Sequence, residues 1–359
     1  MYQEQAEMLS TQFGLNHHSS AKDATMKPIG NGHINTTLLL QGVDSPVVVQ
    51  KLNAYVFPEL NELVKNARLI EQHLQDKKST NRYNLDIIKH VATTEHKYLV
   101  DIDGDSWRAL EFIGGSYSED VVVNKRQAKV AANAFGQFAA ALEDFDASQL
   151  FSVIPDFHHL AKRIDTLKAV VQADKHNRLD SAREQVDFCL SQQALVDELE
   201  TLKNQLPLRA CHNDTKINNM LFCSSEHNAK AVIDMDTCMS GYWLFDFGDM
   251  VRTFCSPEAE DSTDLDNVII REEIFEAIVD GYVTPLENVI TKTEKQSFWV
   301  GAKVMCLMIG VRFLTDYLDG DNYFAIKKDG HNLDRAKNQF ALYQDLLKKE
   351  HKLKAMLYR

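Results

Sequence analysis

The segment from His212 to Asp249 most constrains what this chain can fold into. It places acidic and amide residues in a fixed order between short apolar runs such as NMLF and AVID. Short apolar runs separated by turn residues are typical of strands. A ribbon of two such strands would bring the polar residues at its ends together, so the segment indicates a chemical site rather than a packing core.

His212, Asp214 and Asn219 form the pattern H-x-D-x-x-x-x-N within this segment. Aspartate and asparagine have the same spacing in the catalytic loop of kinases, H-R-D-x-x-x-x-N. Phosphoryl transfer needs one carboxylate to orient the attacking hydroxyl and further oxygen ligands to hold magnesium on the nucleotide phosphates. The spacing therefore predicts a loop for phosphoryl transfer. We expect His212 to be structural, with its ring packed under this loop.

Two further aspartates follow the loop, and we expect them to differ in role. Asp234 ends the apolar AVI run, where a two-strand ribbon returns it beside the loop, and we predict it as the main magnesium carboxylate. Asp246 belongs to a literal Asp-Phe-Gly, the metal motif of protein kinases. However, it leads into DMVRTF, which is typical of a helix start, so we expect Asp246 to cap that helix and brace the catalytic loop.

The rest of the chain changes texture near Gly114. Residues 25–50 predict a hairpin, 59–74 carry a helical stripe of apolar residues, and 85–113 return to short strand-like runs. Helical patterns dominate afterwards. We therefore predict an N-terminal lobe over 1–114 and a C-terminal lobe over 115–359.

The overall charge argues against two classes of partner. The 359 residues include 39 Lys and Arg against 52 Asp and Glu, a net charge of −13. A negative surface repels nucleic acid backbones and anionic lipids, so we expect neither nucleic acid nor a membrane as a partner. The sequence does not indicate an oligomeric state.

Three other features bear on the location of the chain. The first residues lack a basic segment followed by an apolar tract, so we expect no secretory signal and a cytoplasmic protein. Six cysteines without a C-x-x-C pair favour reduced thiols and argue against a zinc site. The apolar tract 298–314 is interrupted by Lys303 and Arg312, so we expect a buried helix rather than a membrane span.

The segments HNDTKINN, VIDMD and LFDFGD, in this order, resemble the aminoglycoside phosphotransferase and choline kinase family. The resemblance implies an α+β, bilobal, protein-kinase-like fold with a small antiparallel-sheet N-lobe and a larger, mainly helical C-lobe. It also implies ATP and Mg²⁺ as cofactors, a nucleotide-binding N-terminal lobe, and a catalytic and sugar-binding C-terminal lobe. Within that family, GNGHINTT, LEFIGG, EDFDASQL and VRFLTDYLDGDNYF resemble the bacterial kinases that phosphorylate the anomeric hydroxyl of N-acetylglucosamine and N-acetylgalactosamine.

Other activities stay open beside this one. The acceptor could instead be choline, homoserine or an aminoglycoside, and the chain could be a kinase-shaped binding module without turnover. A protein kinase is disfavoured, because no A-P-E segment or long activation loop follows Asp234.

The resemblance implies roles for the residues of the catalytic block. Asp214 would orient the sugar hydroxyl and accept its proton, while Lys216 would neutralise charge on the transferred phosphoryl group. Asn219 and Asp234 would hold magnesium. Asp236 would either be a second metal ligand or orient the first.

The nucleotide would bind between a glycine turn and an interlobe hinge. The turn runs from Gly30 to Thr36, and its glycines would let backbone N–H groups approach the phosphates. The hinge from Glu111 to Gly114 would read the purine edge with backbone groups, beside Val49. The implied nucleotide contacts are Gly30, Asn31, Gly32, Asn35, Thr36, Gln50, Lys51, Glu111, Phe112 and Ile113.

The strand lysine of ordinary kinases aligns here with either Gln50 or Lys51, and only one of these can face the cleft. An inward Gln50 would pair with Asn66, which gives a neutral pair, whereas an inward Lys51 would pair with Glu71. We favour the neutral pair.

For the sugar, the resemblance points to Arg312, with His33 and Tyr317 nearby and Asp214 at the reacting hydroxyl. Guanidinium donors suit fixed hydroxyl groups. The alternative for Arg312 is a buried ion pair with Asp316, one helical turn later.

Overall fold

The computed structural model describes residues 2–30 and 34–359. The chain forms two compact units. The first comprises Met1–Ser118, Ser148–Ile154 and Asn218–Met239, and the second comprises Glu119–Ala147, Pro155–Ile217 and Ser240–Arg359. The first unit therefore combines the N-terminal sheet region with residues 218–239, which lie beyond the lobe boundary that the sequence predicts at residue 114.

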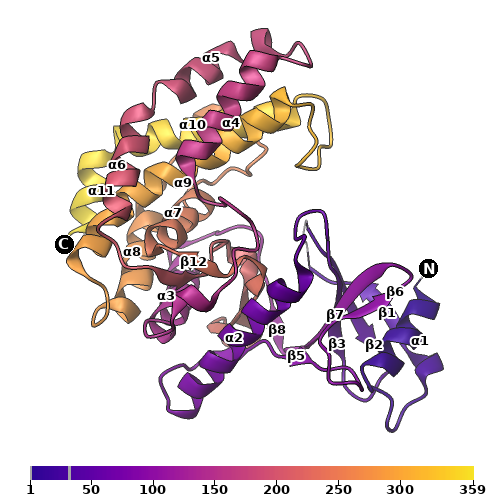
Figure 1. Ribbon diagram of the computed structural model, residues 1–359. Helices are drawn as coiled ribbons and strands as arrows, with labels where there is room; N and C mark the ends of the chain where they lie inside the picture. Colours follow the sequence, from indigo (N-terminus) through magenta and orange to yellow (C-terminus); the bar gives the residue numbers. More distant parts are fainter. Residues whose placement is uncertain (1, 31–33) are drawn as a thin grey trace. The chain divides into compact units, whose positions relative to one another are not determined.

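The first unit contains an antiparallel sheet in the order β1-β2-β3-β7-β5, with β6 also paired to β7 (Figure 1). Its strands are β1 (Thr25–Pro28), β2 (Thr36–Gln41), β3 (Val47–Lys51), β5 (His90–Val91), β6 (Val100–Ile102) and β7 (Asp105–Glu111). The predicted hairpin is confirmed as β2–β3. Gly42 in its turn has φ +75°, and a Cβ there would lie 1.9 Å from the backbone oxygen of Asp23, so the turn requires glycine.

Helix α1 (Gln3–Gln12) packs against this sheet. The first unit also contains the 3₁₀ turn η1 (Ala21–Asp23) and helix α2 (Leu60–Ser79), which confirms the predicted helical stripe. Leu9 of α1 belongs to an apolar core with Leu40, Val49 and Trp107 of the sheet. Because side chains alternate along a strand, the neighbours of these core residues point to the opposite face. That face lines the cavity described below.

A second sheet of the first unit has the order β4-β11-β10-β8. Its strands are β4 (Asp86–Ile87), β8 (Ser116–Tyr117), β10 (Met220–Cys223) and β11 (Ala229–Val232). The 3₁₀ turns η3 (Ile217–Asn219) and η4 (Met235–Thr237) flank the β10–β11 ribbon. The backbone amide of Ile233 donates to the carbonyl of Asn219 at 2.9 Å. The ribbon thus brings Asn219 and Asp234 to the same end, as the spacing predicted.

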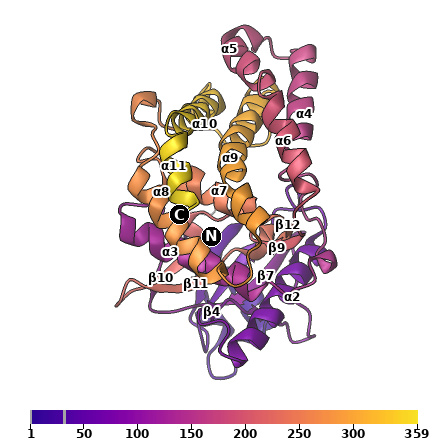
Figure 2. The same ribbon diagram turned by 90° about the vertical axis from the view of Figure 1, so that its left-hand side faces the viewer.

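The second unit is largely helical, as expected. Its helices are α3 (Lys125–Ala141), α4 (Leu160–Ala173), α5 (Leu179–Leu190), α6 (Gln193–Lys203), α7 (Trp243–Phe254), α8 (Glu272–Leu286), α9 (Lys292–Leu318), α10 (His331–Lys348) and α11 (Glu350–Leu357), with the 3₁₀ turn η5 (Leu265–Asn267) and the two-stranded sheet of β9 (Arg209–Cys211) and β12 (Met239–Gly241). The 3₁₀ turn η2 (Ala147–Gln149) lies where the chain passes from the second unit into the first. Helices α4, α5, α6 and α10 all contact α9 (Figure 2).

Helix α9 is the centre of this unit. It is long and apolar enough to cross a membrane by length and composition, but 83% of its most apolar stretch is buried inside the protein, as for the core helix that the sequence predicts. Its Gly301 touches α7: a Cβ at Gly248 would lie 2.2 Å from the Gly301 oxygen. The backbones of α7 and α9 therefore pack closely together at these two glycines, which holds α7 and its Asp246 in position.

Candidate active site

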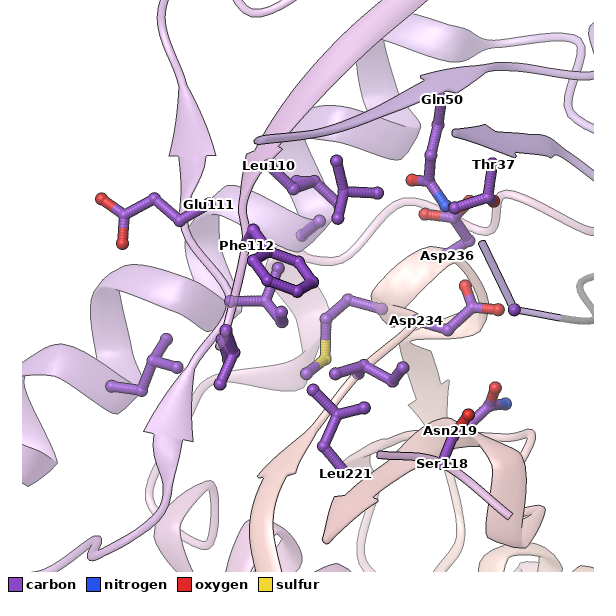
Figure 3. A pocket seen from close by; sticks show the side chains of 18 of the residues that line it. Thr37, Gln50, Leu110, Glu111, Phe112, Ser118, Asn219, Leu221, Asp234 and Asp236 are labelled. Atoms are coloured by element: carbon purple, nitrogen blue, oxygen red, sulfur yellow. The ribbon is translucent and has the colours of Figure 1, made fainter. Parts of the chain in front are cut away.

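A cavity of about 350 Å³ lies within the first unit, a size suited to a small ligand (Figure 3). Sequence-predicted residues that line it are Gly30, Gln50, Glu111, Phe112, Ile113, Asn219, Asp234 and Asp236. Asn35, Thr36 and Lys51 do not line it. Asn31, Gly32 and His33 lie outside the described residues.

One end of the cavity is apolar. Its walls include Val48, Leu110 and Leu221 beside Phe112 (Figure 3). The expectation that Val49 lies here is wrong, because Val49 points into the core on the other face of β3 and Val48 takes its place. The Glu111 side chain points away from the cavity and pairs with Lys89 at 3.5 Å, so this end offers apolar walls.

The other end is polar and carries oxygen donors. Asp234 and Asp236 enter from the segment after β11, and Asn219 enters from the end of η3, just before β10 (Figure 3). Asp234 has φ +62° and an exposed side chain. Asp236 is buried and accepts a 2.7 Å hydrogen bond from Nδ2 of Asn35. The oxygens of Asn219 and Asp234 therefore suit a hard cation.

Gln50, rather than Lys51, lines the cavity. Nε2 of Gln50 donates to Oγ1 of Thr37 at 3.0 Å, and Oε1 accepts from Nε and Nη2 of Arg108 at 2.9 and 2.7 Å. Lys51 points to the other face and pairs with Asp105 at the surface, at 3.3 Å. Because side chains alternate along a strand, Gln50 faces the cavity and Lys51 faces away from it.

The neutral pair of Gln50 with Asn66 is not formed. Nδ2 of Asn66 donates to the carbonyls of Phe151 and Cys238, and its Oδ1 accepts from the Phe151 amide. Glu71 accepts instead from His90 and pairs with Arg68. The sequence prediction was wrong here because it sought the partner of Gln50 on α2, whereas the partner is the cross-strand Arg108 of β7.

The catalytic block is braced within the second unit as predicted. The buried Asp246 carboxylate accepts hydrogen bonds from the backbone amides of His212 and Asn213 at 3.0 and 2.7 Å. Asp246 lies in the first turn of α7 but does not cap this helix, so the expectation of a helix cap was wrong. Burial raises the pKa of Asp246 to about 6, while the hydrogen bonds from the two backbone amides oppose this rise.

His212 has the structural role that we expected. It is fully buried, and its ring makes edge contacts with Phe135 and Phe138 at 5.4 and 5.7 Å between centroids. Nδ1 accepts from the backbone amide of Asp214 at 3.3 Å, so the ring supports the loop through an amide. Asn213 between them has φ +64°, a conformation that asparagine tolerates better than most residues.

Asp214 and Lys216 lie together. Nζ of Lys216 is 3.1 Å from Oδ1 of Asp214, and the charge of that carboxylate raises the pKa of Lys216. Next to them, Nε2 of His158 contacts the carbonyl of Asn213 at 3.2 Å. Burial, together with the nearby charge of Arg312, lowers the pKa of His158 to about 3.

Arg312 lies among aromatic rings. Its guanidinium carbon is 5.2, 5.6 and 5.4 Å from the ring centroids of Phe157, Tyr323 and Phe324. The alternative ion pair with Asp316 is not formed, because that carboxylate accepts from the backbone amides of residues 322–324 and from the side chain of Asn332. Burial lowers the pKa of Arg312 to about 10, so it stays a cation at neutral pH.

Tyr317 is engaged elsewhere. Its ring packs under Arg178, with 4.8 Å from guanidinium carbon to centroid, and its hydroxyl lies 2.8 Å from Oγ of Ser181. Its contacts therefore join α9 to the start of α5. Tyr323, which the sequence analysis did not single out, is the tyrosine beside Arg312, and no periodic signal marks it because it lies beyond the end of α9.

Solved structures share this fold at low sequence identity. An aminoglycoside phosphotransferase from Alicyclobacillus acidocaldarius is 13% identical, with a TM-score of 0.55 over 97% of this chain and 93% of that one. Choline kinase from Cryptosporidium parvum is 15% identical, with a TM-score of 0.59 over 99% of both chains. A spectinomycin phosphotransferase, solved with ADP and spectinomycin, is 16% identical, with a TM-score of 0.55 over 97% of this chain and 98% of that one.

The family follows from the sequence itself. The model of the phosphotransferase enzyme family (APH) matches residues 25–280, well over half of the chain. The matched range contains both the cavity of the first unit and the braced loop of the second. The chain therefore belongs to the phosphotransferase enzyme family and has its kinase-like fold, an antiparallel sheet followed by a largely helical part.

Proposed function

We propose that this protein is a cytoplasmic, ATP- and magnesium-dependent kinase that phosphorylates the anomeric hydroxyl of an N-acetylhexosamine. The observation that carries the phosphotransfer part is the cavity of the first unit, which joins apolar walls for a purine to the oxygens of Asn219 and Asp234. Related proteins of the fold were solved with ADP or ATP, which supports the choice of nucleotide.

Magnesium fits the donor set at the polar end. Asn219 offers an amide oxygen and Asp234 a carboxylate, and Mg²⁺ in proteins typically takes one or two carboxylates plus phosphate oxygens of the substrate. Among the described residues no three His, Cys, Asp or Glu side chains form a metal cluster, in keeping with an ion that takes further ligands from the nucleotide. When bound, the ion would neutralise phosphate charge.

Asp214 would act on the acceptor. Its carboxylate would accept a hydrogen bond from the anomeric hydroxyl, which orients that oxygen for attack on the γ-phosphorus. The new bond joins the sugar oxygen to phosphorus, the bond from phosphorus to the bridging oxygen of ADP breaks, and the hydroxyl proton passes to Asp214. Lys216, 3.1 Å from that carboxylate, would hold it and offset charge on the transferred group.

The charge around Arg312 favours a neutral acceptor. No carboxylate among the described residues pairs with this guanidinium, which stays cationic among three rings. Both Arg312 and Asp214 shift the pKa of His158 through their charges, so each of them lies near that ring within the second unit. A cation there repels the ammonium group of choline or an aminoglycoside, whereas it can donate to the hydroxyl and acetamide oxygens of a neutral sugar.

A panel of acceptors tests this proposal. ADP release is measured with N-acetylglucosamine, N-acetylgalactosamine, choline, homoserine, an aminoglycoside and a generic protein acceptor. The N-acetylhexosamines should give the highest kcat/KM, and Asp214→Asn should lower the rate of ADP release by about 10²- to 10⁴-fold. A cationic acceptor turned over faster than both sugars would overturn the acceptor class and leave a kinase of the same family. No ADP release with any acceptor would favour a binding module without turnover.

A further inference from the structure

We infer that Arg108 of β7 supplies the phosphate-binding cation of the nucleotide cavity, the task that a β3 lysine performs in ordinary kinases. This inference rests on the proposed nucleotide site of the first unit. It concerns a residue that the motifs of the chain do not mark, since Arg108 lies in the strand-like run WRALEF, before the hinge.

The cavity needs such a cation because neither residue at the position of the usual β3 lysine, Gln50 or Lys51, brings a charge to it. Gln50 lines the cavity but is neutral, and Lys51 points to the opposite face of β3 and pairs with Asp105. The polyphosphate of a nucleotide brings several negative charges into a cavity whose wall already carries Asp234 and Asp236. A cation supplied by the protein lowers this repulsion.

Arg108 has the right position. It is the cross-strand partner of Gln50 in the β3–β7 register, so both side chains leave the sheet on the same face. It is the single Arg or Lys among the described residues that line this cavity, and its exposed fraction is 2%. The charge therefore lies inside the wall and is screened little by solvent.

The guanidinium is also held in one orientation. Nε and Nη2 donate to Oε1 of Gln50, and Nη2 forms an ion pair of 2.6 Å with Oδ1 of Asp236, at an angle outside hydrogen-bond geometry. Nη1 makes no hydrogen bond with any residue of the ranges 2–30 and 34–359. Two anchors thus fix the planar group and leave donors for a ligand, which reduces the entropy lost on binding.

The same contacts assign a positioning role to Asp236. One carboxylate oxygen faces Arg108 and the other accepts from Nδ2 of Asn35, whose Oδ1 in turn accepts from the backbone amide of Asn53. With one oxygen hydrogen-bonded to Asn35 and the other in an ion pair with Arg108, Asp236 orients the arginine rather than ligating a second metal ion. Gln50 and Asp236 act together as the clamp of Arg108.

Nucleotide binding by calorimetry tests the inference, with ATP, ADP and adenosine in the presence of Mg²⁺. Arg108→Gln should weaken ATP and ADP binding by about 10- to 100-fold, the value of one or two charge-assisted hydrogen bonds, and leave adenosine binding unchanged. The double variant Gln50→Lys/Arg108→Gln, which returns a lysine to β3, should recover part of the ATP affinity. Lys97→Gln, which removes an exposed cation of the same unit, is the matched control and should bind all three ligands as the wild type does.

Two results would overturn the role of Arg108: wild-type ATP affinity in Arg108→Gln, or an equal loss for ATP and adenosine, which is the mark of a merely structural arginine. If Arg108→Gln does not fold, Arg108→Lys is tested instead. Lysine keeps the charge but lacks the planar, forked donors of a guanidinium, so this variant should weaken ATP binding but not adenosine binding. Wild-type protein that binds ATP no more tightly than adenosine would overturn the proposed function together with this inference.

Discussion

Oδ1 of Asp246 accepts a 2.7 Å hydrogen bond from the backbone amide of Asn213, and its other oxygen accepts from the amide of His212 at 3.0 Å. A single buried carboxylate on α7 thus holds two consecutive amides of the predicted catalytic loop. Thr215 adds a third link, because its hydroxyl donates to the backbone oxygen of Asp246 at 2.7 Å. The aspartate of the Asp-Phe-Gly in this chain therefore holds the predicted catalytic loop in place.

Replacing Asp246 by alanine should destabilise the fold by about 3 kcal/mol, because two buried amides lose their acceptor. Denaturant unfolding measures this loss, and the exposed Asp266→Ala is the control. An Asp246→Ala protein of normal stability that has lost only magnesium affinity would show that Asp246, rather than Asp234, is the metal carboxylate.

Replacing Asp214 by asparagine should lower kcat by about 10²- to 10⁴-fold, because an amide cannot accept the hydroxyl proton. The dissociation constant of MgATP should change little, since the carboxylate acts on the acceptor. Steady-state kinetics and calorimetry give the two values, with the exposed Asp187→Asn as the control. An equal loss in nucleotide affinity would contradict the role assigned to Asp214.

Replacing Asp234 by alanine should remove most of the magnesium dependence of nucleotide binding. The exposed carboxylate is the charged oxygen donor at the polar end of the cavity, apart from Asp236, which is clamped to Arg108. Titration of a fluorescent ATP analogue with and without Mg²⁺ measures the effect. Asp103→Asn, on an exposed turn of the same unit, should behave as the wild type. Unchanged magnesium dependence in Asp234→Ala would reject this ligand.

His158 should make the fold acid-sensitive. Its folded pKa of about 3 lies below the ordinary histidine pKa of 6.5, so below pH 6.5 the unfolded chain takes up a proton that the folded chain does not. The stabilisation is present above pH 6.5 and falls as the pH falls, by about 2 kcal/mol at pH 5.

Urea unfolding of the wild type and of His158→Gln, which keeps a donor toward the Asn213 carbonyl, measures this contribution across pH 5–7. The difference between the two free energies of unfolding should shrink toward pH 5. His351→Gln on exposed α11 should run parallel to the wild type. Parallel curves for His158→Gln as well would mean that this ring titrates normally in the folded protein.

The sequence predicted those parts of the site that depend on local order. Phosphoryl transfer restricts both residue type and spacing around Asp214 and Asn219, and the β10–β11 ribbon is formed by neighbouring residues. Its return of Asp234 to the Asn219 end could therefore be inferred before the structure was known. The brace by Asp246 followed from the helical pattern after it.

The sequence did not reveal those parts of the site that depend on how strands far apart in the chain align with each other. The pairing of Arg108 with Gln50 is set by the alignment of β3 with β7, which are separated by α2 and several short strands. Whether Val48 or Val49 faces the cavity depends on which face of the sheet α1 covers. Tyr323 reaches Arg312 because Asp316 binds the amides of residues 322–324, a loop contact without periodicity.

Phosphorus NMR of the product from N-acetylglucosamine and MgATP tests the central claim most directly. The account predicts a new phosphomonoester resonance coupled to the anomeric proton, formed together with ADP and absent with Asp214→Asn. Phosphate attached to any other carbon of the sugar, or inorganic phosphate as the sole product beside ADP, would contradict the account.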